Sequence, residues 1–92
     1  MNYEIKPDLD RILQKLKRKD PESFKAVLNK IKEIVDSGNP DHYKPLRYDL
    51  KNKKSVHIRK SFVLIFEYDQ NTNTIYFLDY DHHDRIYLKQ YQ

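Results

Sequence analysis

Two adjacent histidines stand between aspartates near the end of the chain, in the stretch YDHHDRIYLK at residues 80–89. Histidine changes charge near neutral pH, so it can act as a catalytic base or acid, and its imidazole also binds metal ions. Tyr87 follows His83 by four residues and adds a phenol that can donate or accept a hydrogen bond. The stretch therefore has three interpretations: a metal site, a set of acid–base groups, or a polar turn.

The sequence pattern argues against a metal site. Adjacent side chains of an extended strand point to opposite faces, so His82 and His83 are predicted not to share an ion. The DHHD order is similar to a signature of metal-dependent phosphoesterases, but those enzymes need further aspartate motifs and a much longer chain. Cysteine is absent, which excludes disulfides and zinc–thiolate sites. We therefore expect no metal and no cofactor.

Acid–base chemistry would need a second group, and His57 is the candidate. The stretch SVHIRK at 55–60 alternates as a strand does, with His57 and Arg59 on its polar face. If this strand and the C-terminal segment flank a central hairpin, His57, His83 and Tyr87 would meet on one sheet face. A base, an acid and cations together suit metal-free RNA cleavage. The alternative, in which all four histidines are surface polar groups, stays open.

Positive charge is concentrated in one part of the chain. The net charge is +4, and residues 44–60 contain seven basic side chains against one acid, Asp49. Such density favours a polyanion partner, most simply nucleic acid, although a solvated lysine-rich turn has the same composition. Lys44 is one of these seven and is also a candidate site residue. The other six form the predicted RNA-binding set, which is Arg47, Lys51, Lys53, Lys54, Arg59 and Lys60.

Two amphipathic helices should support these groups. Apolar residues recur at helical spacing over about 8–19 and again over about 24–37. Asp8 and Asp20 are predicted N-caps, and Gly38 stands where a helix C-terminus favours a left-handed residue. The short link between the two stripes predicts an antiparallel helical hairpin.

After residue 46 the pattern becomes typical of strands. Residues 62–68 are apolar on both faces, as in a central strand, and 75–80 follow a polar turn. Residues 2–6 can add a short edge strand, and short connections predict antiparallel pairing. We expect an α+β fold in which the N-terminal helical hairpin packs on a small twisted antiparallel sheet. The residues expected to be buried are Phe24, Leu28, Ile31, Leu64 and Phe66.

Three stretches in this order resemble the RelE/ParE toxin superfamily, and above all the RelE/YafQ-type mRNA interferases. They are KPLRYDL at 44–50, SVHIRKSFVLIFEY at 55–68 and IYFLDYDHHDRIY at 75–87. Each stretch is short, so their order and spacing carry the resemblance. With the helical hairpin before them, they extend it over almost the whole chain, which we interpret as one domain at residues 1–92.

The resemblance implies a metal-independent endonuclease that cuts mRNA, usually in the ribosomal A site. It also implies neutralisation by a cognate antitoxin encoded by an adjacent gene. By position, it implies catalytic roles for His57, His83 and Tyr87, with Lys44 standing where other members have a histidine. Attack by the 2′-hydroxyl would give a 2′,3′-cyclic phosphate and a 5′-hydroxyl.

Two other functions fit the same family. A ParE-like toxin would inhibit DNA gyrase without cutting, and a degenerate relative would only bind RNA or an antitoxin. Val63 and Asp79 stand where relatives have functional arginines, which keeps the last alternative open. No apolar run approaches 18 residues and no signal-peptide pattern is present, so we expect a cytoplasmic protein outside the membrane. The oligomeric state has no signal in the sequence.

Overall fold

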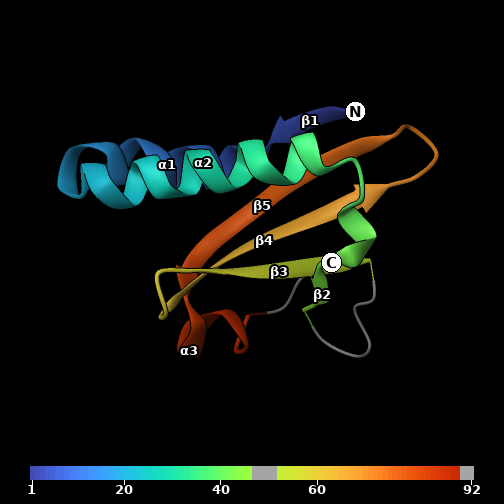
Figure 1. The fold of residues 1–92 in the computed structure, drawn as a ribbon. Coiled ribbons are helices and arrows are strands. Elements are labelled where there is room, and N and C mark those ends of the chain that lie inside the picture. The colour runs from blue at the N-terminus through green and yellow to red at the C-terminus, as the bar shows by residue number, and fades with distance from the viewer. Residues whose placement is uncertain (47–51, 90–92) are drawn as a thin grey trace.

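The computed structural model describes residues 1–46 and 52–89, and Figure 1 shows their arrangement. The elements follow one another as β1 (Asn2–Ile5), α1 (Pro7–Lys19), α2 (Pro21–Ser37), η1 (Pro40–His42), β2 (Lys44–Pro45), β3 (Lys53–Ile58), β4 (Phe62–Asp69), β5 (Thr74–His82) and α3 (His83–Ile86), where η1 is a short 3₁₀ helix.

The described strands form one five-stranded sheet in the order β1-β5-β4-β3-β2. The predicted α+β fold and the N-terminal helical hairpin are confirmed. The prediction of a wholly antiparallel sheet is wrong at one edge, where β1 pairs in parallel with β5 and Tyr3 lies opposite Ile75. Short loops enforce antiparallel pairing, but the whole helical hairpin separates β1 from the rest of the sheet, and such a long connection permits parallel pairing.

The helix ends follow local side-chain chemistry. Asp20 caps α2, because its carboxylate accepts hydrogen bonds from the Ser23 N–H at 3.2 Å and the Ser23 hydroxyl at 2.6 Å. These hydrogen bonds hold the pKa of Asp20 below its usual value. Gly38 ends α2 in the left-handed conformation, as predicted, with φ of 68°. Asp8 lies in the first turn of α1 instead of capping it; the N-cap position is Lys6.

The main core lies between the helical hairpin and one side of the sheet, here called the helix face. Ile31, Leu64 and Phe66 are buried in it as predicted, and Phe24 is partly buried against it. The prediction for Leu28 is wrong, since it is 39% exposed. It lies at the flank of the apolar stripe of α2, beside a groove shared with Tyr3 of β1.

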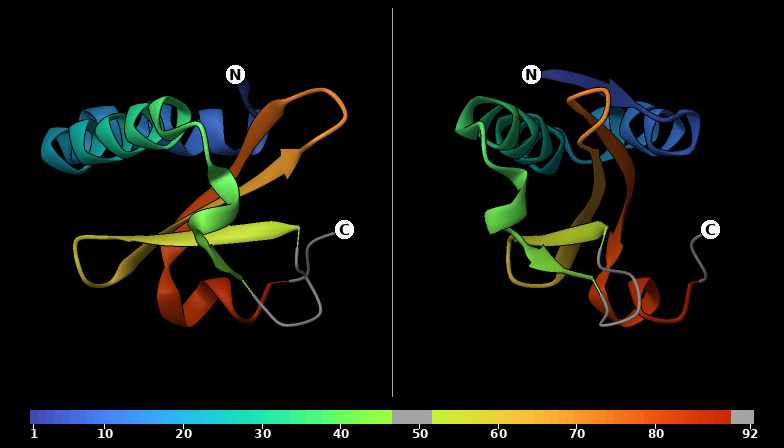
Figure 2. Two further views of the ribbon diagram at one scale, coloured as in Figure 1. Left: turned by 45° about the vertical axis from the view of Figure 1, so that its right-hand side comes forward. Right: turned by 90° about the vertical axis from the view of Figure 1, so that its right-hand side faces the viewer.

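Among the described helices, α3 alone packs on the other side of the sheet, here called the open face. Figure 2 shows α1 and α2 together on one side of the sheet and α3 beyond the opposite side. Ile86 of α3 is fully buried there against Val63 and Ile65 of β4 and against Leu46. The open face is therefore the side on which polar side chains remain accessible.

None of the helices in residues 1–46 and 52–89 is long and apolar enough to cross a membrane.

Candidate active site

A cleft of about 460 Å³ opens where β2 pairs with β3 and where the chain leaves α3. It brings together three of the four predicted catalytic residues, Lys44, His57 and Tyr87, from separate parts of the chain. It also contains His42, which the sequence analysis did not single out. The lining residues are His42, Tyr43, Lys44, Pro45, Leu46, Ser55, Val56, His57 and Tyr87.

Tyr43 anchors the first segment of the cleft. Its ring meets the buried Phe66 ring edge-on, with centroids 5.5 Å apart, and the His42 ring stacks on Tyr43 at 4.5 Å. Lys44 follows in β2, exposed and directly opposite Ser55 of β3. The aromatic anchor thus fixes the segment that carries an imidazole and an ammonium group. His42 is the last residue of η1, so the alternation of an extended strand does not predict its place in the cleft.

His57 stands on the second wall of the cleft. It pairs with Val63 across β3 and β4, and cross-strand partners share a face, so His57 lies on the open face. Its side chain is exposed, and within the described part of the chain it makes no hydrogen bond. An exposed imidazole without a structural partner can exchange protons with a bound substrate.

Tyr87 closes the cleft from the side of α3. The preceding residue, Ile86, is fully buried, whereas Tyr87 is 45% exposed. Burial of Ile86 therefore fixes the start of a segment whose next side chain reaches the cleft. Tyr87 thus lines the cleft with a side chain whose chemistry suits contact with a base or a phosphate.

His83, the fourth predicted catalytic residue, is not among the lining residues of this cleft. The backbone N–H of His83 donates to the Ser61 carbonyl oxygen at 2.8 Å, and the ring Nδ1 lies 3.1 Å from the same oxygen. Its Nε2 lies 2.9 Å from Oδ1 of Asp84. His83 is therefore engaged at the turn between β3 and β4.

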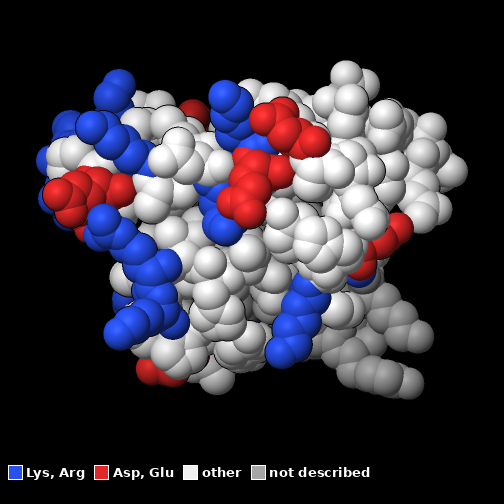
Figure 3. All heavy atoms as spheres, viewed as in Figure 1, with Lys and Arg blue, Asp and Glu red and all other residues white. Residues whose placement is uncertain are grey.

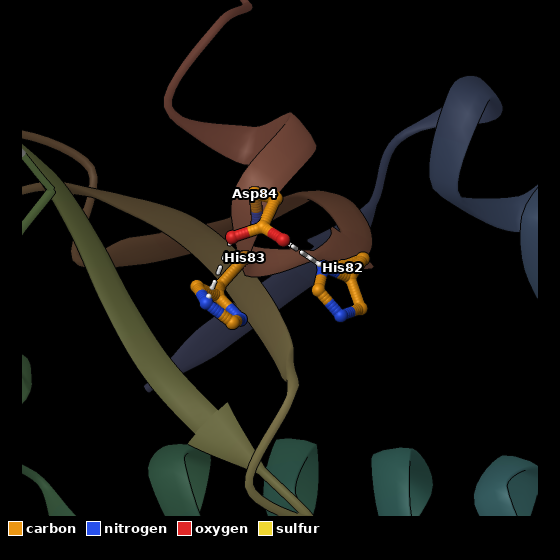
Figure 4. Close-up of side chains that lie close together, drawn as sticks. All are labelled: His82, His83 and Asp84. Carbon is orange, nitrogen blue, oxygen red and sulfur yellow. Dashed lines mark hydrogen bonds and ion pairs between the residues drawn. The ribbon is translucent and has the colours of Figure 1, made fainter.

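The prediction that His82 and His83 point to opposite sides is wrong. Their rings are stacked, with centroids 4.7 Å apart, and the carboxylate of Asp84 faces both of them (Figure 4). The reason is that β5 ends at His82 and α3 begins at His83, so the alternation of an extended strand stops between them. The possible ligand atoms of these three residues all lie within 4.8 Å of one another, which is a spacing that could hold a metal ion.

The positions at which relatives have arginine are explained by packing. Val63 is fully buried beneath α3, where a charged side chain would have no access to solvent. Asp79 is also buried, and Lys89 reaches it from the C-terminal segment with Nζ 2.6 Å from Oδ2. Lys89 also contacts Asp81 at 3.1 Å. Burial disfavours the charge of Lys89, but these two carboxylates outweigh it and raise the pKa of the ammonium group.

The basic segment is less exposed than its composition predicts. The Lys53 side chain is 5% exposed and lies 3.5 Å from Glu67, and Lys54 is 9% exposed beside a cleft lined by Glu67 and Asp69. Both lysines belong to the predicted RNA-binding set, and both side chains are largely covered in the structure. On the neighbouring strands Glu67 lies opposite Lys53, and Phe66 and Pro45 lie opposite Lys54, so cross-strand neighbours can cover the stems of both lysines.

The remaining basic residues have different surroundings. Arg59 turns toward the helix face, where it lies 3.4 Å from Glu22, whereas Lys60 is exposed. Arg47 and Lys51 lie outside the described residues. Figure 3 shows Lys and Arg side chains gathered at the end of the molecule that holds the α1–α2 link and the β3–β4 turn. The exposed basic residues at this end include Lys17, Arg18 and Lys19 of α1 and Lys60.

The most similar curated proteins found come from archaea. The chain is 54% identical over 87 residues to the protein named "Putative toxin RelE4" of Methanocaldococcus jannaschii, covering 95% of this chain and 90% of that protein. It is 40% identical over 83 residues to an uncharacterized protein of Methanosarcina mazei, covering 90% of this chain and 94% of the relative. No protein-family model matches the chain.

Solved structures share the fold over nearly the whole chain. The toxin–antitoxin complex RelBE2 from Mycobacterium tuberculosis contains a chain that matches with a TM-score of 0.68 at 26% identity, over 88% of this chain and 95% of that one. A YoeB/ParE toxin from Agrobacterium tumefaciens matches with a TM-score of 0.74 at 13% identity, over 90% and 99%. The second match concerns the fold alone.

Proposed function

The chain belongs to the RelE/ParE toxin superfamily, and on that premise we propose that it is the toxin of a toxin–antitoxin module and acts as a metal-independent endoribonuclease. One observation supports the enzymatic part of the proposal. His57, Lys44, Tyr87 and His42 line a single cleft, so two imidazoles, an ammonium group and a phenol are available to one substrate.

The proposed reaction uses the substrate's own 2′-hydroxyl as the nucleophile. His57 takes the proton of that hydroxyl, and the oxygen then forms a bond to the adjacent phosphorus. The bond from phosphorus to the 5′-oxygen breaks, and His42 donates a proton to the departing oxygen. Lys44 stabilises the negative charge that develops on the phosphoryl oxygens, and Tyr87 orients the phosphate or a flanking base. The products are a 2′,3′-cyclic phosphate and a 5′-hydroxyl.

His83 has no part in this scheme, because its contacts with Ser61 and Asp84 hold it outside the cleft. The exposed residue Lys60 and the last turn of α1 would attract the RNA backbone. The substrate proposed from the family is mRNA in the ribosomal A site, which puts the reaction in the cytoplasm.

A cognate antitoxin is the proposed protein partner. The similar Mycobacterium tuberculosis chain was solved in a toxin–antitoxin complex, and the present chain carries a net charge of +4. An antitoxin segment rich in acidic and apolar residues would lie along the toxin and cover the cleft. Size-exclusion chromatography with the product of the adjacent gene tests this partner. Co-elution at micromolar concentration is expected, and separate elution would contradict the proposal.

The decisive experiment is an analysis of cleavage products on programmed ribosomes. We expect fragments that end in a 2′,3′-cyclic phosphate, unchanged yields in EDTA, and a bell-shaped dependence of kcat/KM on pH if His57 and His42 act in opposite protonation states. A 3′-hydroxyl end, or loss of cleavage in EDTA, would contradict the mechanism. Inhibition of DNA gyrase without any RNA cleavage would instead identify the ParE-like alternative.

A further inference from the structure

We propose that His82, His83 and Asp84 form a binding site for one divalent metal ion such as zinc, separate from the cleft. These three residues are here called the His–His–Asp cluster. The group stands at the junction of β5 and α3, next to the turn between β3 and β4. Figure 4 shows both rings and the carboxylate turned toward one another.

The spacing of the ligand atoms suits a single ion. His83 Nε2 lies 2.9 Å from Asp84 Oδ1, and His82 Nδ1 lies 3.6 Å from Asp84 Oδ2. Zinc binds nitrogen and oxygen ligands at about 2.0–2.2 Å, so neighbouring ligands of a tetrahedral ion are roughly 3.3 Å apart. The two observed distances lie on either side of this value. The possible ligand atoms all lie within 4.8 Å of one another, so rotations of the side chains would bring them to one ion.

The hydrogen bond of His83 fixes which nitrogen is available. The Ser61 carbonyl oxygen can only accept, so the Nδ1 that lies 3.1 Å from it carries the hydrogen. In the neutral ring, Nε2 then directs a lone pair at the carboxylate oxygen of Asp84, 2.9 Å away. Two acceptors at this separation repel unless a cation lies between them. That cation is a proton on Nε2 or a metal ion.

The surroundings of His83 are those of a metal-binding histidine. A ligating imidazole generally donates its other N–H to a backbone carbonyl or a carboxylate, which fixes the ring, and the Ser61 carbonyl has that role here. His82 is fixed differently, because its ring stacks on His83 and meets the Phe62 ring edge-on at 5.5 Å. Both rings are thus held in place before any ion binds.

His82 Nδ1 also carries a lone pair, which is directed at a backbone N–H beside the site. It accepts a hydrogen bond of 3.2 Å from the backbone N–H of Asp84 at the start of α3, so this nitrogen carries no hydrogen. A bound ion would replace that hydrogen bond with a coordinate bond. The basic residue nearest in sequence, Arg85, is paired with Asp81 at 3.2 Å and not with the cluster.

The donor set identifies the class of ion. Two imidazoles and one carboxylate suit zinc, nickel or copper ions, whereas magnesium and calcium prefer sites built from oxygen ligands alone. Three protein ligands leave a fourth position for water. Because the cluster shares no residue with the cleft, the ion would act on structure. It would add a second attachment for α3, whose main anchor in the core is Ile86.

Zinc titration of the untagged, EDTA-treated chain in the absence of RNA tests the site independently of any nuclease activity. Isothermal titration calorimetry should give one zinc ion per wild-type chain and no signal with magnesium. His82→Ala, His83→Ala and Asp84→Asn each change a direct ligand, and each should weaken zinc binding by more than the about 10–100-fold that loss of an outer-shell partner typically costs. Asp84→Asn is the mildest of these, because it keeps the shape of a side chain that is 76% exposed.

The chain provides matched controls, since its other two histidines, His42 and His57, line the cleft. His42→Ala and His57→Ala should bind zinc as tightly as the wild type. Loss of binding in these two variants with retention in the cluster variants would overturn the proposal, as would a wild-type chain that binds no zinc below millimolar concentration. A circular-dichroism spectrum of each variant checks that it remains folded.

Discussion

The hydrophobic clusters on the two faces of the sheet differ in size. On the helix face, eleven buried residues of the described part of the chain form one core that includes two long helices. On the open face, three other buried residues of the same part pack against Ile86 of α3, a helix of four residues. The residues of the candidate active site line a cleft beside the smaller cluster. The comparison indicates that the helix face supplies most of the stability, whereas the open face supplies accessible polar groups at some cost in packing.

The largest expected effect separates activity from stability. His57→Ala should reduce RNA cleavage by about 10²–10⁴-fold, because a positioned acid or base contributes that much, and should leave the melting temperature unchanged because the ring is exposed. His83→Ala and His82→Ala should reduce cleavage far less. Single-turnover cleavage of the purified variants measures this. Equal losses for His57→Ala and His83→Ala would show that the active site extends beyond the cleft.

On the helix face we expect a substitution to reduce stability in the first place. Phe66→Ala should lower the free energy of unfolding by about 3–5 kcal/mol, because the ring is fully buried between the helices and the sheet. Urea unfolding followed by circular dichroism gives the value. A loss below about 0.5 kcal/mol would be typical of a surface position and would contradict the assignment of β4 as a central strand.

An intermediate result is expected for Ile86→Ala. This residue is fully buried but belongs to the smaller cluster, so we expect a loss near the lower end of the range of about 2–5 kcal/mol for such truncations. Hydrogen exchange should increase mainly in α3, and RNA cleavage should fall because Tyr87 loses its support. Uniform acceleration of exchange over α1 and α2 would show that the two faces are not independent.

Removal of one exposed charge on the open face should have a smaller effect on RNA binding. Lys44→Gln should weaken RNA binding and lower the slope of log affinity against log salt by about 0.7, the value for one phosphate contact with a single strand. Lys32→Gln, on the exposed side of α2, is the matched control and should change neither quantity. Fluorescence anisotropy at several salt concentrations measures both. An unchanged slope in Lys44→Gln would exclude a phosphate contact at this residue.

The smallest expected effect concerns the cap of α2 on the helix face. Because folding lowers the pKa of Asp20, its stabilising contribution is present above the usual aspartate range and is lost as the pH falls through the lowered value. The melting temperature should therefore fall more between pH 6 and pH 2 in the wild type than in Asp20→Asn. Equal pH dependence in the two proteins would show that the carboxylate contributes nothing beyond its shape.

The sequence predicts the helix face better than the open face, for physical reasons. Helical periodicity and capping are local, so the helices and the burial of Phe66 follow from short stretches. The cleft depends on contacts between distant segments. The sequence predicts that His57, His83 and Tyr87 meet, and the cleft contains His57 and Tyr87 but not His83. The place of His42 in the cleft depends on the packing of Tyr43 against the core, which no local pattern predicts.

Two features of the structure depend on contacts that the sequence pattern does not show. The charge of Lys53 and Lys54 suggests exposure, but both side chains are largely covered, with Glu67 and Phe66 of β4 directly opposite them. The alternation of a strand suggests opposed histidines, but β5 ends between His82 and His83. In both cases the outcome depends on the three-dimensional structure. The cross-strand neighbours of β3 decide the exposure of the lysines, and the end of β5 decides the direction of the histidine side chains.

The parallel pairing of β1 with β5 has a consequence for synthesis on the ribosome. β1 emerges first, but its partner Ile75 emerges only after both helices and the strands β2 to β4. The helical hairpin depends on local contacts and can form early, whereas this edge of the sheet must wait for a contact that spans most of the chain. Tyr87 emerges later still. A ribosome making the protein therefore carries an incomplete cleft until the segment that contains Tyr87 has emerged.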